Sequence, residues 1–183
     1  MHEVSLGQIL RDYLTGNAIE STTYEDLRQS LAKVFVEELG YNSANLIPKV
    51  EITFLRGAEE FSRSVDIVIY NDAGAPEVAV LFCAGQVNTF AREGLALARL
   101  LPKGPAPLLV ITDTKTAVLF DVSTGKLLEE GIQALPRKEK LEKLLRTVQI
   151  EKLDEKTIEM EKRILDAYSQ FQKTCCTECV SVE

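Results

Sequence analysis

The chain has 183 residues and a formal net charge of −7 at pH 7, with 45% hydrophobic and 27% charged residues. This composition suits a folded domain and excludes a chain that is disordered by composition. The acidic balance argues against a protein built around a basic DNA-binding surface. The apolar runs are too short to cross a bilayer, and the start at Met1 lacks the pattern of a signal peptide. We therefore expect a cytoplasmic protein with no membrane partner.

Two helices are predicted in the first forty residues. The spacing of apolar residues predicts a short helix over 6–14 that ends near Gly16. Thr22 and Glu25 have the spacing of a capping box, in which a hydroxyl and a carboxylate satisfy free backbone N–H groups at a helix start. Apolar residues at helical spacing follow, and Gly40 is predicted to end this second helix.

Five strands and one more helix are predicted in the middle of the chain. The strands are read from alternating or almost continuously apolar runs over 50–54, 64–70, 77–83, 108–112 and 116–122. The second and third of these form a hairpin, and a helix over 87–101 separates the third from the fourth. A strand–helix–strand step favours a crossover connection and a mixed sheet. The predicted fold is α/β, with a mixed sheet of about five strands flanked by helices.

Two helices are predicted to close the chain, over 138–147 and 154–172. They define a C-terminal helical extension, residues 136–183, after a first domain of residues 1–135. In the last helix a 4-3 alternation, typical of a short coiled coil, is formed by Leu153, Met160 and Ala167 with Thr157, Ile164 and Phe171. The alternation predicts a homodimer through this helix, and the alternative is that the same face packs on its own domain.

The first part of the chain resembles a known family. The resemblance starts with Gly16, Ile19, Thr22, Glu25, Arg28-Gln29 and Glu37-Glu38-Leu39-Gly40-Tyr41, and continues through the runs SVDIVIY, EVAVLFC and LLVITDTKTAVLFDVSTGKLL. These residues, roughly 15 to 130, resemble the N-terminal nuclease domain of type I restriction enzyme R subunits, which belongs to the PD-(D/E)XK superfamily. The resemblance implies a restriction-endonuclease-like fold and a Mg²⁺-dependent cleavage of DNA.

The resemblance also assigns site residues, and one motif is missing. Asp66 matches the metal-binding aspartate of the family, and Glu25 matches an acidic residue of its first helix. The family carries a Glu-x-Lys at the end of the third strand, but this chain has Phe82 and Ala84 there. Two structural readings stand beside these assignments: Asp66 lies at a sheet edge or pairs with Arg63, and Glu25 serves the capping box.

A migrated site is the alternative route to activity. The candidate carboxylates are Glu51, Glu77 and Glu93, and we expect no lysine suitably placed near them. If the chain is active, Asp66 would hold Mg²⁺; otherwise no cofactor is expected.

The cysteines of the tail and the single histidine limit which other metal sites and acid–base catalysts the sequence allows. Cys176 and Cys179 form one C-x-x-C, which is half of a zinc site, and a second chain could complete it. The alternative is an exposed, redox-sensitive tail. His2 is the one histidine of the sequence, which argues against histidine catalysis and His-rich metal sites.

The leading hypothesis is a stand-alone, catalytically degenerate homologue of the nuclease domain. It would act as a binding or assembly module, with DNA or a restriction-modification complex as the partner. The chain is too short for the DNA-translocating motor region of a complete R subunit and lacks its phosphate-binding loop. The alternatives are a Mg²⁺-dependent endonuclease with a migrated site, and an oligomeric scaffold built on the C-terminal helix.

Overall fold

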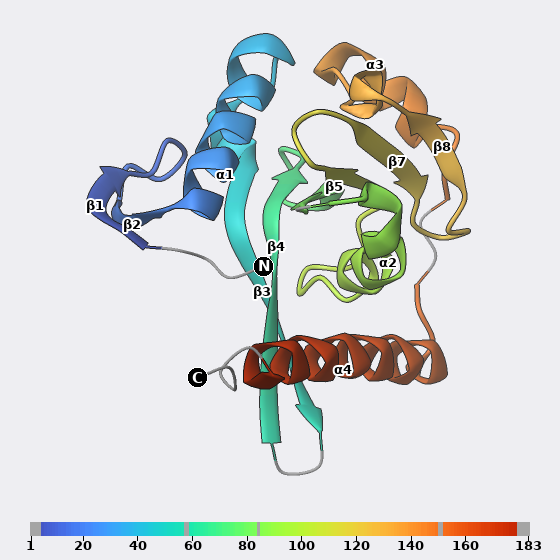
Figure 1. Cartoon of the computed structure of the whole chain (residues 1–183). Coiled ribbons are helices and arrows are strands. Elements are labelled where there is room, and N and C mark those ends of the chain that lie inside the picture. The colour runs from blue at the N-terminus through green and yellow to red at the C-terminus, as the bar shows by residue number, and fades with distance from the viewer. Residues whose placement is uncertain (1–4, 57–58, 84, 150–151, 179–183) are drawn as a thin grey trace.

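A six-stranded mixed sheet forms the centre of the fold (Figure 1). The computed structural model describes residues 5–56, 59–83, 85–149 and 152–178, without the side chains of 56, 59 and 170–178. In spatial order, the strands are β3 (Leu46–Arg56), β4 (Glu59–Tyr70), β5 (Pro76–Phe82), β6 (Leu108–Thr112), β7 (Ala117–Asp121) and β8 (Leu127–Glu130). Strands β5 and β6 pair in parallel, and the other four pairings are antiparallel.

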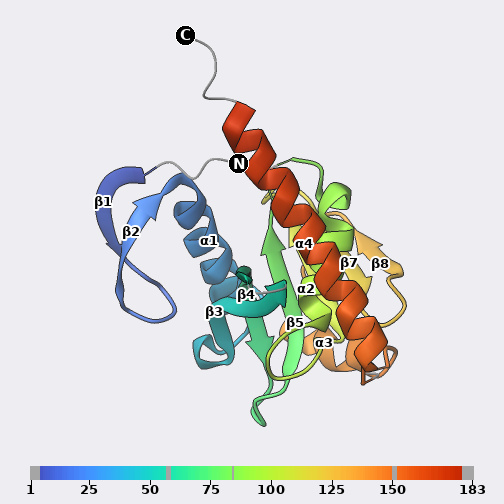
Figure 2. The same ribbon diagram turned by 90° about the horizontal axis from the view of Figure 1, so that it is seen from below.

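Helices cover both faces of this sheet (Figures 1 and 2). They are α1 (Thr23–Lys33), which continues into the π-helical turn η1 (Val34–Glu38), α2 (Ala91–Arg99), α3 (Lys138–Leu145) and α4 (Glu155–Glu178). Short 3₁₀ turns are η2 (Ser43–Asn45), η3 (Val87–Phe90) and η4 (Ile132–Ala134). Leu31 of α1 and Leu141 of α3 belong to one apolar core, whereas Leu95 of α2 and Leu165 of α4 belong to the other. Among the described residues, no helix combines the length and the apolar character that a membrane crossing requires.

The predicted α/β fold with a mixed sheet is confirmed. Strands β4 and β5 form the predicted hairpin, and α2 connects the parallel strands β5 and β6. Helix α1 starts after Thr22, whose hydroxyl accepts a hydrogen bond from the Glu25 N–H at 3.0 Å. This contact is the first half of the predicted capping box. The division of the chain at residue 135 stays a prediction.

Gly94 allows α2 to lie directly on the sheet. A Cβ atom at this position would lie 2.9 Å from Leu81 Cδ1 and 3.0 Å from Leu109 Cδ2. We expect Gly94→Ala to lower the free energy of unfolding by about 1–2 kcal/mol, because overpacking outweighs the higher helix propensity of alanine. Urea unfolding of the native protein and of Gly94→Ala measures this difference. An unchanged or raised midpoint for Gly94→Ala would contradict the close approach.

Helix α4 is attached to its own domain by a buried charge. The carboxylate of Glu161 accepts hydrogen bonds from Arg92 at 2.6 Å and Arg99 at 2.7 Å. Leu165, one turn later, is fully buried, whereas Met160 of the predicted coiled-coil alternation is 46% exposed. The helix therefore packs on the domain through a face offset from that alternation. The homodimer stays a prediction, and light scattering would test it.

The prediction for the start of the chain was wrong. The predicted helix over 6–14 is instead strand β1 (Ser5–Arg11), which pairs antiparallel with β2 (Ala18–Thr22) in a separate two-stranded sheet. The Asp12 carboxylate accepts the N–H groups of residues 14 and 15, which turns the chain back after β1. In the main sheet β8 adds a sixth strand at the edge, in keeping with the predicted sheet of about five strands.

Candidate functional site

Asp66 lies at an irregularity in strands β3 and β4. At this point the regular alternation of side chains between the two faces of the sheet is interrupted. Val65 belongs to the core under α2 and α4, whereas Ile67 belongs to the core under α1. Residues 48 and 50 of β3 pair with residues 67 and 65 of β4, which leaves Lys49 directly across from Asp66. Lys49 has φ +50°, in the left-handed region that is uncommon for residues other than glycine. The irregular backbone thus brings one acidic and one basic side chain together.

The Asp66 carboxylate is buried and hydrogen-bonded at both oxygens. The Tyr24 hydroxyl donates to Oδ1 at 2.5 Å, and the Phe82 N–H donates to Oδ2 at 2.7 Å. The rings of Tyr24 and Phe82 meet edge to face, with centroids 5.2 Å apart. Strand β4 lies between β3 and β5, so the reading of Asp66 as a sheet-edge residue was wrong. Instead, an aromatic pair covers the aspartate.

Burial raises the pKa of Asp66 to about 6, because the charged carboxylate loses contact with water. Hydrogen bonds from Tyr24 and Phe82, and the positive charges of Arg28 and Lys49, act in the opposite direction without cancelling the effect of burial. Near neutral pH this side chain therefore carries a charge that the fold only partly compensates.

A second group of buried polar side chains surrounds Glu25 on α1. Arg28 forms ion pairs with Glu25 and with Asp12, and its Nε donates to Glu25 Oε1 at 2.6 Å. Gln29 Nε2 donates to both carboxylates at 3.0 Å, and Lys49 Nζ lies 2.6 Å from Glu25 Oε2. Burial alone would raise the pKa of Glu25 and Asp12, but the bonds from Arg28 hold both below their usual range. Both acids are therefore charged and paired with cations.

One comparison with known proteins gives a match. The family model described as type I restriction enzyme R protein N terminus matches residues 23–136, which is more than half of the chain. The chain belongs to this family. No curated protein and no solved structure matches it. The matched residues run from the first residue of α1 to the segment after η4, so they include Glu25, Lys49, Asp66 and Phe82 but not α4.

The residues present do not fit the Mg²⁺ site that the resemblance implies for the R protein N-terminal family. Mg²⁺ requires several oxygen ligands in nearly octahedral geometry. Both oxygens of Asp66 already accept protein hydrogen bonds, and Glu25 is paired with two cations. The part of the chain that the structure describes contains no group of three or more His, Cys, Asp or Glu side chains that could hold a metal.

The carboxylates considered for a migrated site have other surroundings. Glu51 is exposed on β3, and Glu77 on β5 lies 3.7 Å from Lys138 Nζ. Glu93 on α2 is buried and forms an ion pair with Arg63 of β4. None of the three joins Asp66 in a group of metal-binding side chains among the described residues.

Sequence reasoning missed three residues of this site. Asp12 was placed in a helix, Tyr24 was not singled out, and no lysine was expected in a suitable place. The structure instead puts Lys49 across from Asp66 and on Glu25. The apolar patterns of the two strands contain a signal for Lys49. Pairing them as a β3–β4 hairpin sets the register, and the register places Lys49 across from Asp66.

The cysteines lie in two different parts of the chain. Cys83 is buried, and burial raises the pKa of its thiol to about 11. Cys176 belongs to α4, in the part whose side chains are not described, and Cys179 lies outside the described residues. The zinc site stays a prediction.

Proposed function

We propose that this chain is a nuclease-type domain without catalytic activity, acting in the cytoplasm as a binding or assembly module of a DNA restriction or processing complex. The observation that carries the proposal is the environment of Asp66, whose two oxygens are bonded to Tyr24 and Phe82. Phe82 stands where the resemblance places the second metal-binding carboxylate. Phe82 is 8% exposed and its ring contacts that of Tyr24, so an apolar group fills the position.

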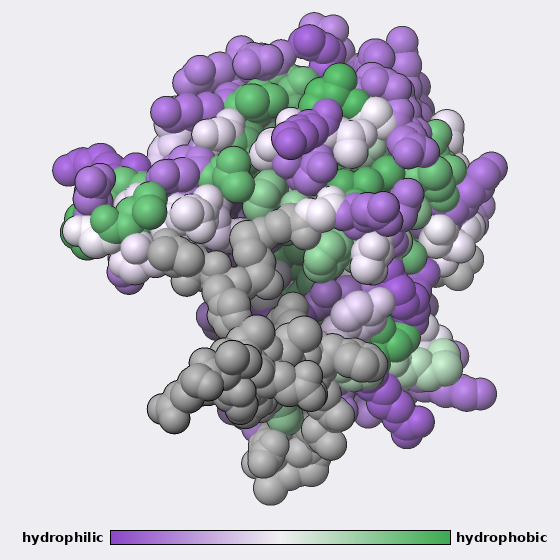
Figure 3. Space-filling model, viewed as in Figure 1, coloured by the Kyte–Doolittle hydropathy of each residue, from purple (hydrophilic) through white to green (hydrophobic). Residues whose placement is uncertain are grey.

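The charges on this face favour a protein partner over DNA. Lys49 is half exposed but is paired with Glu25, and Arg63 is paired with Glu93. Glu51 lies exposed close to Lys49 on the same strand. On the described part of the face seen in Figure 3, hydrophobic residues are interspersed with hydrophilic ones. A salt-dependent gel shift with duplex DNA would contradict this choice of partner.

Replacing Phe82 with a carboxylate should create the missing metal site. In Phe82→Glu, two carboxylates would lie side by side, and their repulsion should lower stability until a divalent cation neutralises it. We expect added Mn²⁺ to raise the melting temperature of Phe82→Glu by several degrees and to leave the native protein unchanged.

Phe82→Gln is the matched control, because it has the size of glutamate without its charge. Differential scanning fluorimetry at pH 7 with and without Mn²⁺ is the measurement. A specific response of the native protein that equals that of Phe82→Glu would show that the native site already holds the metal, against the proposed loss of catalysis.

One observation favours a second candidate function, a metal-dependent endonuclease with a migrated lysine. In the strand pairing Lys49 lies across from Asp66, its ammonium nitrogen lies 2.6 Å from Glu25 Oε2, and its side chain is 52% exposed. A lysine beside two acids could orient a water molecule, as the lysine of the missing motif would. If this function is real, Lys49→Met abolishes DNA cleavage, whereas Lys126→Met, which is exposed and distant in sequence, does not.

A further inference from the structure

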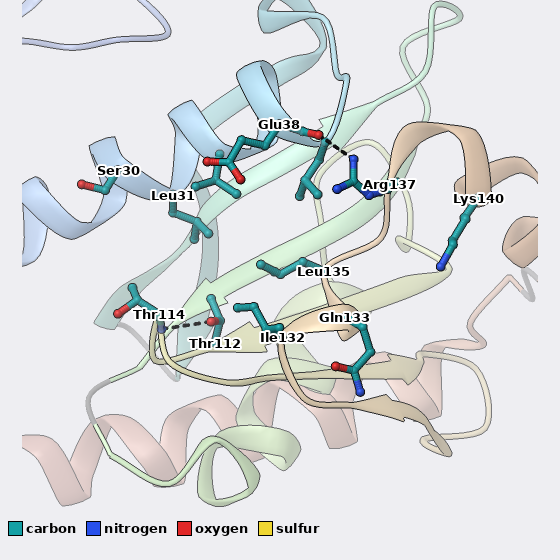
Figure 4. A pocket seen from close by; sticks show the side chains of 12 residues that line it. Ser30, Leu31, Glu38, Thr112, Thr114, Ile132, Gln133, Leu135, Arg137 and Lys140 are labelled. Carbon is teal, nitrogen blue, oxygen red and sulfur yellow. Dashed lines mark hydrogen bonds between the residues drawn. The ribbon is translucent and has the colours of Figure 1, made fainter.

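A cavity of about 430 Å³ lies between α1 with η1 on one side and the segment from η4 to α3 on the other (Figure 4). Cavities of this size hold small ligands in other proteins. Its apolar lining comes from both sides and consists of Leu31, Val34, Leu39, Ile132 and Leu135. Figure 4 shows the Ile132 and Leu135 side chains pointing into this space. Ile132 is 55% exposed, so a ligand with an apolar body would remove this surface from water.

The charges at the cavity favour an anion. Arg137 and Lys140 both line it, against a single carboxylate, that of Glu38. Arg137 Nη1 donates to the Glu38 carbonyl oxygen at 2.8 Å, which fixes the guanidinium at the cavity. Among the described residues, no ion pair engages Lys140 or Arg137. In a chain of net charge −7, two cations without an ion-pair partner among the described residues, beside an apolar cavity, indicate a negatively charged ligand.

The backbone around the cavity departs from regular structure at two places. In η1 the Leu39 N–H donates to the Val34 carbonyl at 3.0 Å, which is the wide i to i+5 bond of a π-helix. Thr114, in the turn between β6 and β7 that also lines the cavity, has φ +75°. Turns of the π type and left-handed residues other than glycine are both frequent at functional sites. Both lie on the cavity wall, which supports a binding role for it.

We propose that this cavity binds a small amphipathic carboxylate. The apolar body of the ligand lies against Ile132 and Leu135, and its carboxylate lies at the mouth beside Arg137 and Lys140. This site is separate from Asp66, and the proposal holds whether or not the domain cleaves DNA.

Octanoate is the probe, with octylamine and octanol as compounds of equal length and different charge. Titrations followed by two-dimensional NMR should show octanoate shifting the amide signals of residues 30–39 and 132–140, with octylamine binding at least about tenfold more weakly. Equal binding of the three compounds, shifts confined to other residues, or no binding of octanoate would each overturn the proposal.

Two variants test the assigned contacts without disturbing the core. Lys140→Gln should weaken octanoate binding about threefold to fivefold, the usual effect of one exposed ion pair, whereas Lys143→Gln on the same helix should leave it unchanged. Ile132→Glu places a carboxylate at an exposed cavity position and should abolish binding. Equal effects of the two lysine variants, or full binding by Ile132→Glu, would contradict the site.

Discussion

Arg28→Met should lower the free energy of unfolding by about 3–5 kcal/mol, because it leaves two buried carboxylates without their shared cation. Arg28 is 1% exposed and pairs with both Glu25 and Asp12. Lys33→Met removes the same charge from the exposed side of the same helix and should change stability by less than about 0.5 kcal/mol. Urea unfolding at pH 7 measures both. Equal effects of the two variants would contradict the role of Arg28.

The effect of Arg28→Met should also depend on pH. In the native protein the pKa values of Asp12 and Glu25 lie below their usual range, so their contribution to stability is present at neutral pH and lost as the pH falls through those lowered values. In the variant both acids are easier to protonate. The difference in stability should therefore shrink as the pH is lowered from 7 toward 4.

Asp66→Asn should stabilise the protein above pH 7 by about 2–3 kcal/mol, because it removes a buried charge and keeps the hydrogen bonds. The asparagine oxygen can accept the Phe82 N–H, while its amide donates to Tyr24. The Tyr24 hydroxyl can then donate to the Phe82 carbonyl oxygen, which lies 3.3 Å away. The surrounding donors and acceptors thus suit the neutral amide.

The sign of this effect follows from the raised pKa. Burial raises the pKa of Asp66 from 3.8 to about 6, so the folded protein binds a proton that the unfolded chain releases between these values. The stability contributed by Asp66 is therefore greatest below pH 4 and is lost as the pH rises through about 6. The gain in Asp66→Asn should be small at pH 4 and complete at pH 8. Glu51→Gln, an exposed carboxylate on β3, should show no such dependence, and a gain that is independent of pH would contradict the buried charge.

The regular elements could be predicted from sequence because their signals are local. The apolar run over 64–70 predicted part of β4, and Thr22 predicted the start of α1. Strand β1 could not be predicted, because Leu6 and Ile9 have helical spacing yet both are exposed in the structure. In this segment the spacing of apolar residues therefore does not indicate which side chains are buried.

The candidate site could be predicted only in part. Asp66 stood out as an aspartate in an apolar strand, whereas its partners come from α1 and from the end of β5. The capping box predicted that the Glu25 carboxylate would bind a backbone N–H group at the start of its helix. In the structure this carboxylate forms ion pairs with Arg28 and Lys49. Such contacts depend on strand register and helix placement, which residue spacing within one element does not contain.

Cleavage of plasmid DNA with Mg²⁺ or Mn²⁺, comparing the native protein with Asp66→Ala and Lys49→Met, is the most direct measurement of whether this domain has lost catalysis. We predict no cleavage above background by any of the three, because the Asp66 and Glu25 carboxylates are already occupied by protein donors and cations. Metal-dependent cleavage by the native protein that disappears in both variants would contradict this and identify Lys49 as part of an active site.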